Sequence, residues 1–188
     1  MSLEPFLYAV VTVFLAELGD KTMLATIFLS AQYRRPGLVL LAAMLALTAS
    51  TIIAIIIGIV LASSLPLSLI FYLAGFLFLI MGVYTLVTSK QTEEVDDVNP
   101  TTFGGMFSLV FLAELGDKTQ IAALALAAQS EAPLLILLGA LLGFLLVNGV
   151  GATMGDKIAA RTSVIWIKRI TGLFFLAFGI LSIFGIIN

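Results

Sequence analysis

Six apolar runs occupy nearly the whole of this chain, and each is long enough to cross a lipid bilayer. They lie near residues 5–31, 37–62, 67–89, 103–129, 134–156 and 164–187. Charged residues make up only 11% of the 188 residues, whereas about 25% is usual in soluble domains. The mean hydropathy is +1.20. We therefore expect an all-α integral membrane protein with six transmembrane helices.

The composition also excludes several kinds of chemistry. The chain contains neither cysteine nor histidine, which excludes disulfides, zinc or iron–sulfur ligation, and thiol or imidazole catalysis. The six runs leave no room for a soluble domain, and a net charge of -2 argues against a nucleic-acid partner. We expect neither an enzyme nor a resident cofactor. The sequence leaves open whether the chain forms a homo-oligomer.

The chain is an internal duplication. The string VFLAELGDKT occurs at residues 13–22 and again at residues 110–119, an offset of 97 residues. The same offset pairs further residues without gaps: Gln32 with Gln129, Pro36 with Pro133, Gly58 with Gly155, Gly75 with Gly172, and Gly82 with Gly179. We expect a first three-helix repeat at residues 1–89, an acidic cytoplasmic linker at 90–102, and a second three-helix repeat at 103–188.

Each repeat contains an odd number of spans, so the second copy is expected to enter the membrane from the opposite side. This is the inverted-repeat plan of many secondary transporters. Among the loops and termini, only the first, third and fifth loops carry basic residues: Arg34, Arg35, Lys90, Lys157, Arg161, Lys168 and Arg169. By the positive-inside rule these loops are cytoplasmic and both termini lie outside. The host membrane is expected to be a prokaryotic plasma membrane or another internal membrane.

The repeated motif lies deep in the first and fourth spans. With a helical rise of about 1.5 Å per residue, Glu17 lies roughly 18 Å and Glu114 roughly 16 Å from the respective helix starts. Both depths are close to the middle of a hydrocarbon core about 30 Å thick. The two motifs, which enter from opposite faces, can therefore meet near the midplane.

Each copy of the motif carries two acids and a lysine on one face of a continuous helix. The reason is the spacing, because the Asp lies three residues after the Glu and the Lys lies four residues after the Glu. Charges inside a bilayer are costly and require pairing, a bound ion or a water-filled cavity. The glycine between Glu and Asp permits either a close helix crossing or a break that exposes carbonyl oxygens.

These groups predict a site for a hard divalent cation. The two motifs together contain four acids, Glu17, Asp20, Glu114 and Asp117, and two lysines, Lys21 and Lys118. When all are ionised their net charge is about -2, which one divalent cation neutralises. Oxygen ligands without sulfur or imidazole favour Mn²⁺, Ca²⁺ or Mg²⁺. Other polar side chains extend the predicted site: Thr22, Thr119, Gln120, Thr51 and Asn148.

Closely spaced acids without their cation should take up protons, which is the physical basis of antiport. We assign this proton coupling to Glu17 and Glu114. The alternative is purely structural: each acid pairs with a lysine and the ion pairs clamp the first and fourth spans together. For the lysines a structural role is at least as well supported as a role in transport. The glycines of the fifth span (139, 143, 149, 151 and 155) and the repeated pairs are interpreted as close-packing positions.

The doubled hexapeptide, at residues 17–22 and 114–119, resembles the signature of uncharacterised protein family 0016, the Golgi manganese and calcium transporter family. That family includes cyanobacterial and plastid manganese transporters, and the resemblance covers essentially the whole chain. It implies transport of Mn²⁺ or Ca²⁺ in exchange for protons, with the motif acids at the site. In a compact prokaryotic member it implies manganese efflux.

Three other functions remain open at this stage. A cation channel would use the same carboxylates without proton coupling. A small-solute exporter could share the six-helix plan, although no apolar or anion-binding subsite is evident beside the acids. A membrane scaffold would keep only the ion pairs.

Overall fold

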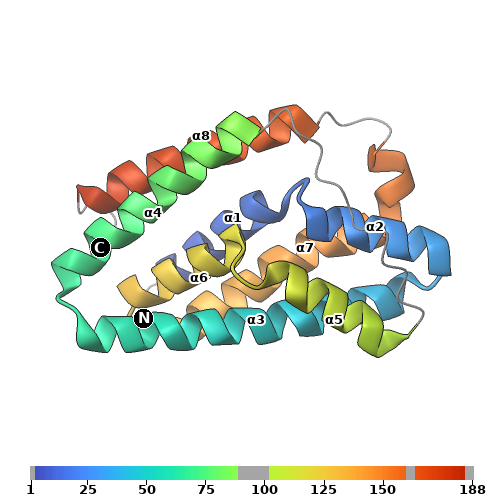
Figure 1. Cartoon of the computed structure of the whole chain (residues 1–188), viewed down its shortest axis with the longest axis horizontal. Helices are drawn as coiled ribbons and strands as arrows, with labels where there is room; N and C mark the ends of the chain where they lie inside the picture. The colour runs from blue at the N-terminus through green and yellow to red at the C-terminus, as the bar shows by residue number, and fades with distance from the viewer. Residues whose placement is uncertain (1–2, 89–101, 160–163, 185–188) are drawn as a thin grey trace.

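The structure, a computed structural model, describes residues 3–88, 102–159 and 164–184. These residues form eight α-helices (Figure 1). The helices are α1 (Glu4–Glu17), α2 (Lys21–Tyr33), α3 (Pro36–Ser64), α4 (Leu67–Val87), α5 (Phe103–Glu114), α6 (Lys118–Gln129), α7 (Pro133–Ala159) and α8 (Val164–Ile183). The expected all-α class is confirmed. The predicted acidic linker, except Thr102, lies outside the described residues, and so do the side chains of the basic residues 157–168.

Three helices are long and apolar enough to cross a membrane, as judged by length and composition over the described residues. They are Pro36–Ser64, Ser68–Val87 and Pro133–Thr153, which correspond to the second, third and fifth predicted spans. Proline starts α3 and α7 at a position where its missing N–H has no intrahelical partner and its fixed φ suits the first turn.

The first and fourth predicted spans are not single helices. The run at 5–31 consists of α1 and α2, and the run at 103–129 consists of α5 and α6. The expectation that the Glu and Asp of each motif share one helical face is therefore wrong. Of the two roles considered for the motif glycine, the helix break is the one observed.

The two halves of the chain are interlocked. Helix α1 packs on α7 of the second half, and its repeat mate α5 packs on α3 of the first. Likewise α2 packs on α7 and α6 on α3, while α3 contacts α7 and α4 contacts α8. Each of these contacts thus has a counterpart under the 97-residue offset. Figure 1 shows α4 and α8 side by side along one edge of the molecule, with α3 along the opposite edge.

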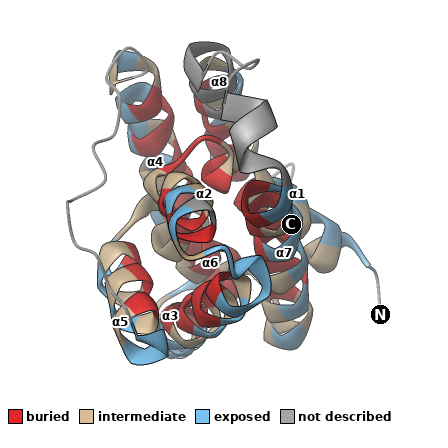
Figure 2. Cartoon of the chain, turned by 90° about the vertical axis from the view of Figure 1, so that its right-hand side faces the viewer, coloured by how far each residue is buried: buried red, intermediate tan, exposed pale blue. Residues whose placement is uncertain are grey.

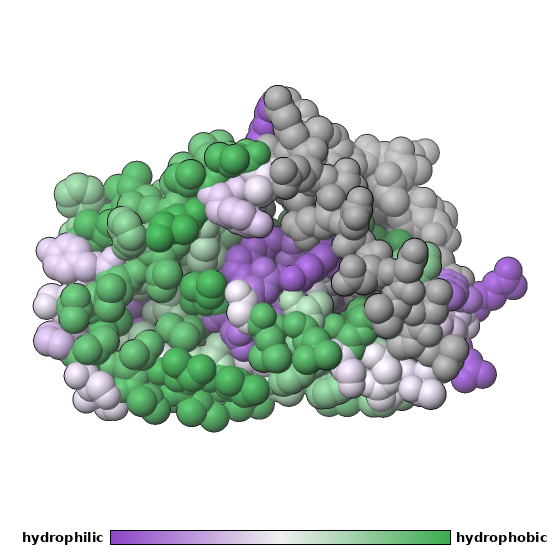
Figure 3. Space-filling view, in the orientation of Figure 1, coloured by the Kyte–Doolittle hydropathy of each residue, from purple (hydrophilic) through white to green (hydrophobic). Residues whose placement is uncertain are grey.

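Large apolar side chains are exposed along the outer faces of the helices. More than half of the surface is exposed for Leu41, Ile56 and Val60 on α3 and for Phe76 and Val83 on α4. Figure 3 shows hydrophobic side chains over much of one face, whereas buried residues lie on the inward sides of the helices in Figure 2. Soluble monomers rarely carry apolar surface this extensive. The protein is therefore an integral membrane protein whose outer surface is suited to lipid.

Helices α4 and α8 approach each other through glycines. An added Cβ at Gly75 would lie 2.8 Å from the carbonyl oxygen of Gly179, and one at Gly82 would lie 2.9 Å from that of Gly172. These distances are shorter than real Cβ contacts, so the helix backbones touch only because side chains are missing. The close-packing interpretation of these four glycines is confirmed.

The same interpretation holds for only part of α7. At Gly139 an added Cβ would lie 2.4 Å from the carbonyl oxygen of Phe6, and at Gly143 it would lie 3.1 Å from Val10 and Phe14 backbone atoms. At Gly149 it would meet nothing within 4 Å, so close packing is the wrong interpretation there.

Candidate metal centre

The first copy of Glu-Leu-Gly-Asp forms a β-turn of type II. Its backbone closes through the N–H of Asp20, which donates to the carbonyl oxygen of Glu17 at 3.1 Å. Leu18 has φ -61° and ψ 115°, and Gly19 has φ +71°. A type II turn requires a positive φ at its third residue, where glycine carries no Cβ penalty. The local sequence therefore ends α1 at Glu17 and starts α2 after Asp20.

The second copy forms the same turn. The N–H of Asp117 donates to the carbonyl oxygen of Glu114 at 3.2 Å, Leu115 has φ -65° and ψ 114°, and Gly116 has φ +80°. Identical residues adopt the same backbone in both halves because the turn is governed by local torsional preferences.

Each turn places one acid on either side of a helix break. Glu17 and Glu114 are the last residues of α1 and α5, and Asp20 and Asp117 are the N-cap residues of α2 and α6. The N-terminus of a helix carries partial positive charge, which favours acidic groups beside it. Half-helices that end at mid-membrane depth are a recurrent device for holding ions in transporters.

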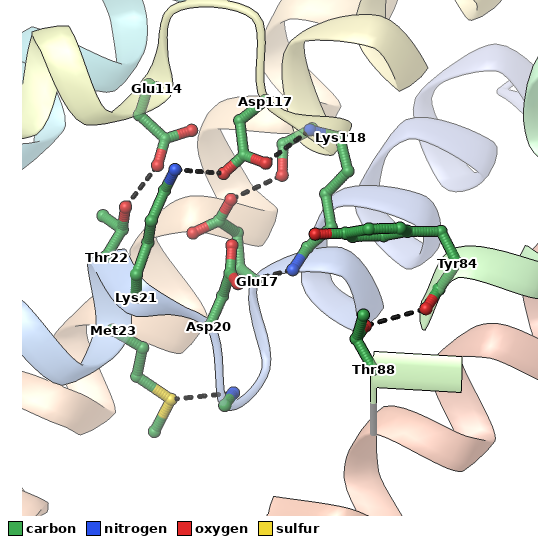
Figure 4. A network of polar contacts seen from close by, with 12 residues as sticks. Glu17, Asp20, Lys21, Thr22, Met23, Tyr84, Thr88, Glu114, Asp117 and Lys118 are labelled. Carbon is green, nitrogen blue, oxygen red and sulfur yellow. Dashed lines mark hydrogen bonds and ion pairs between the residues drawn. The ribbon is translucent and has the colours of Figure 1, made fainter. Parts of the chain in front are cut away.

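The glutamates accept hydrogen bonds from the opposite repeat (Figure 4). The hydroxyl of Thr119 donates to Oε1 of Glu17 at 2.6 Å, and the hydroxyl of Thr22 donates to Oε1 of Glu114. The two contacts are related by the 97-residue offset. Both glutamates are almost completely buried, with exposed fractions of 0% and 1%.

The aspartates pair with the lysines of the opposite repeat. Nζ of Lys21 lies 3.3 Å from Oδ2 of Asp117, and Nζ of Lys118 lies 2.5 Å from Oδ1 of Asp20. These ion pairs obey the same offset. The predicted four acids and two lysines are thus all present in one contact network that joins the two repeats, as Figure 4 shows.

The network engages at least one carboxylate oxygen of each acid with a protein donor. No group of three acidic side chains within the described residues is placed to hold a metal ion by itself. Among the same residues, Oε2 of Glu17 is buried and lacks a hydrogen-bond partner. Chemically the network offers carboxylate and hydroxyl oxygens, which suit hard cations, while two ammonium groups compete for those oxygens.

Residues four positions after the glycines cap the turns. Oε1 of Gln120 accepts a hydrogen bond from the N–H of Gly116 at 2.6 Å, and its amide nitrogen donates to the carbonyl of Ser50 on α3 at 3.2 Å. In the first half the N–H of Gly19 contacts Sδ of Met23 at 3.4 Å. Sequence reasoning included Gln120 but missed Met23. The offset of 97 residues, which makes them repeat mates, was the available signal.

The two remaining predicted polar residues, Asn148 and Thr51, are buried. Oδ1 of Asn148, on α7, lies 3.0 Å from the hydroxyl of Thr26, which also contacts the carbonyl oxygen of Thr22 at 2.8 Å. Asn148 therefore contacts the α2 segment that carries Thr22. Thr51 is buried on α3. Thr26 was missed, although it follows Thr22 by one helical turn on the same face.

The Gly116 turn can be tested without steric complications. An added Cβ would meet nothing within 4 Å, so Gly116→Ala costs only backbone strain at φ +80°, about 1–2 kcal/mol. We expect a lower midpoint of thermal unfolding in detergent. The matched control is Gly104→Ala, at a helical glycine that also has nothing within 4 Å of an added Cβ. Equal midpoints for the two variants would contradict the type II turn.

Interrupted helices whose broken ends bring acids and lysines together inside an apolar bundle are features of ion transporters. The sequence model described as "Divalent cation/proton antiporter GDT1" matches residues 5–93 and 102–187. The chain therefore belongs to this family of divalent cation/proton antiporters.

Individual relatives agree with the family assignment. The chain is 35% identical over 170 residues to a Vibrio cholerae protein named "Putative manganese exporter", covering 89% of this chain and 85% of the relative. It is 31% identical over 202 residues to the Synechocystis protein "GDT1-like protein sll0615", covering 96% and 97%. It is 25% identical over 238 residues to the Saccharomyces cerevisiae "Divalent cation/proton antiporter GDT1", covering 97% and 84%. No solved structure matches the chain.

Proposed function

We propose that this protein exports Mn²⁺ in exchange for H⁺, with Ca²⁺ as the alternative cargo. The observation that carries the proposal is the reciprocal network in which the acids of each repeat contact the threonine and lysine of the other. Membership of a divalent cation/proton antiporter family and similarity to a protein named as a manganese exporter support it.

The proposed architecture is a six-span inverted repeat. Helices α1 and α2 together count as one interrupted span, and so do α5 and α6, while α3, α4, α7 and α8 are the other four. The paired contacts between halves support two repeats, residues 1–89 and 103–188, joined by a cytoplasmic linker at 90–102. The proposed orientation, with odd-numbered loops cytoplasmic and both termini outside, comes from the distribution of basic residues.

The proposed cation ligands are Glu17, Asp20, Glu114 and Asp117. In the structure the aspartates contact lysine ammonium groups, so a cation that binds there must displace at least one lysine. The displaced lysine leaves behind carboxylate oxygens that a divalent cation neutralises more completely than a single positive charge does. The threonine hydroxyls on the two glutamates orient their carboxylates for this purpose.

The proposed proton carriers are Glu17 and Glu114. Both are buried, and each accepts a hydrogen bond from a threonine. A carboxyl group can accept such a bond when it is ionised and also when it is protonated. When the cation leaves, protons neutralise these acids. The protein then returns, with its site neutral, to the conformation that opens to the other side of the membrane. Exchange follows because cation and protons compete for the same oxygens.

The experiment is transport by the purified full-length protein in proteoliposomes. We expect an imposed pH gradient to drive Mn²⁺ against the direction of proton movement, measured with a metal-sensitive dye and a pH-sensitive dye in parallel. A collapsed pH gradient should remove accumulation of Mn²⁺ above equilibrium. Mn²⁺ flux without counter-movement of protons would instead identify a channel, and transport of a small organic solute without a metal requirement would identify a solute exporter.

A further inference from the structure

The two ion pairs of the network are repeat mates with identical sequence around them, yet they differ in exposure. In the Lys21–Asp117 pair the side chains are 37% and 18% exposed. In the Lys118–Asp20 pair they are 16% and 2% exposed. The identical decapeptides cannot cause this difference, so it arises from the residues and helices packed around them.

The turns beside these pairs differ in the same sense. Leu115 is 46% exposed and Gly116 is exposed, whereas Gly19 and Asp20 are buried. Backbone outside a helix is tolerated at membrane depth only where protein covers it or water reaches it. The turn between α5 and α6 is not covered, and Figure 3 shows hydrophilic side chains near the middle of the face where this turn lies. By this rule the turn between α5 and α6 requires contact with water.

We propose that the two ion pairs are the gates of the transport path, and that in this structure the Lys21–Asp117 gate faces water while the Lys118–Asp20 gate is closed off from it. The proposal rests on the proposed transport function and assigns to the two lysines a role in that function. Pseudo-symmetry then defines the opposite conformation, in which the Lys118–Asp20 pair is exposed and the Lys21–Asp117 pair is buried.

The physical reason for gating is the cost of parting a buried ion pair. Lys21 can leave Asp117 for water with little desolvation cost, because more than a third of its side chain is already exposed. Parting Lys118 from Asp20 would break an ion pair whose carboxylate is almost completely buried, which is strongly unfavourable. A cation that enters from the water at this turn therefore displaces Lys21 first, and the path stays blocked at Lys118 until the halves rearrange.

The natural absence of cysteine allows a direct test, since any introduced thiol is the only one in the chain. The probes are Leu115→Cys in the exposed turn and its repeat mate Leu18→Cys in the other turn. Full-length protein in liposomes is treated with a charged methanethiosulfonate reagent present on both sides of the membrane. A permanently charged reagent modifies thiols that water reaches and spares those that face lipid.

We expect Leu115→Cys to react at least about tenfold faster than Leu18→Cys, because the opposite conformation is a minor state. Removing the closed gate with Asp20→Asn and Lys118→Gln together should raise the rate at Leu18→Cys several-fold. Because both partners are replaced, neither charge of this ion pair is left behind alone, and we expect the variant to keep its fold. The matched control, Lys21→Gln with Asp117→Asn, should leave Leu18→Cys slow.

Equal rates for the two thiols in the parent protein would overturn the proposal. So would a Leu18→Cys rate that stays unchanged, or one that rises equally with either pair removed. Lys118→Arg, which retains the charge, should keep Leu18→Cys slow, and a fast rate there would also count against a gate. Labelling needs neither Mn²⁺ nor a pH gradient. The labelling rates therefore test the gate proposal independently of the transport assay that tests the proposed Mn²⁺/H⁺ exchange.

Discussion

Replacing Glu17 or Glu114 by glutamine is expected to reduce Mn²⁺/H⁺ exchange by at least about 100-fold, because losing one buried charged ligand costs about 3 kcal/mol. Glutamine has the same shape and can still accept the hydrogen bond from Thr119 or Thr22. The fold should therefore persist while the charge that attracts the cation and the carboxyl group that carries the proton are lost. The measurement is initial Mn²⁺ uptake in proteoliposomes under a fixed pH gradient.

Two other glutamates provide matched controls for this experiment. Glu4 and Glu131 are exposed, and the same substitution to glutamine there should leave uptake unchanged. Uptake that survives both Glu17→Gln and Glu114→Gln would show that the cation site lies elsewhere. A large loss at only one of the two would show that the repeats have diverged in their roles.

Disrupting the glycine contact between α4 and α8 is expected to have the largest effect on stability. The variant Gly82→Ala with Gly179→Ala places a methyl group within 2.9 Å and 2.8 Å of the partner helix's carbonyl oxygens. Helix backbone cannot move aside as a side chain can, and overpacking of this kind costs about 1–3 kcal/mol at each site. We expect the midpoint of thermal unfolding in detergent, followed by circular dichroism, to fall by about 5–15 °C.

Gly149→Ala is the control for this prediction. It introduces the same methyl group into the interior of α7, where an added Cβ meets nothing within 4 Å. Alanine favours the helix by about 1 kcal/mol over glycine, so the midpoint should stay the same or rise. If the double variant in α4 and α8 had the same unfolding midpoint as the control, the close approach of these two helices would be contradicted.

The membrane class, the all-α fold and the family could be predicted from the sequence because each depends on many residues at once. Apolar runs long enough to cross a bilayer leave no soluble alternative, and ten consecutive identical residues exclude chance. The residues of the candidate site could also be selected in advance, because charged groups are rare and costly in such a chain. The cation and proton roles assigned to these residues remain predictions until transport is measured.

The backbone at the motif could be predicted only in part. Apolar sequence flanks the charged motif on both sides within residues 5–31, so the first span was expected to be one helix. Glycine allowed both a close crossing and a break, and propensity alone does not choose between them. The type II turn explains the outcome, because Gly19 and Gly116 are the two described glycines with positive φ.

The sequence by itself determined which groups are present in each half, and it limited any break in the first and fourth spans to the motif glycines, because these depend on residue type and on torsions within four consecutive residues. Only the tertiary structure decided that each lysine pairs with the aspartate of the opposite repeat, and that one pair is exposed while its mate is buried. Identical decapeptides have identical local preferences. Their surroundings are not identical, because the helices packed around them differ in sequence, and burial depends on those distant contacts.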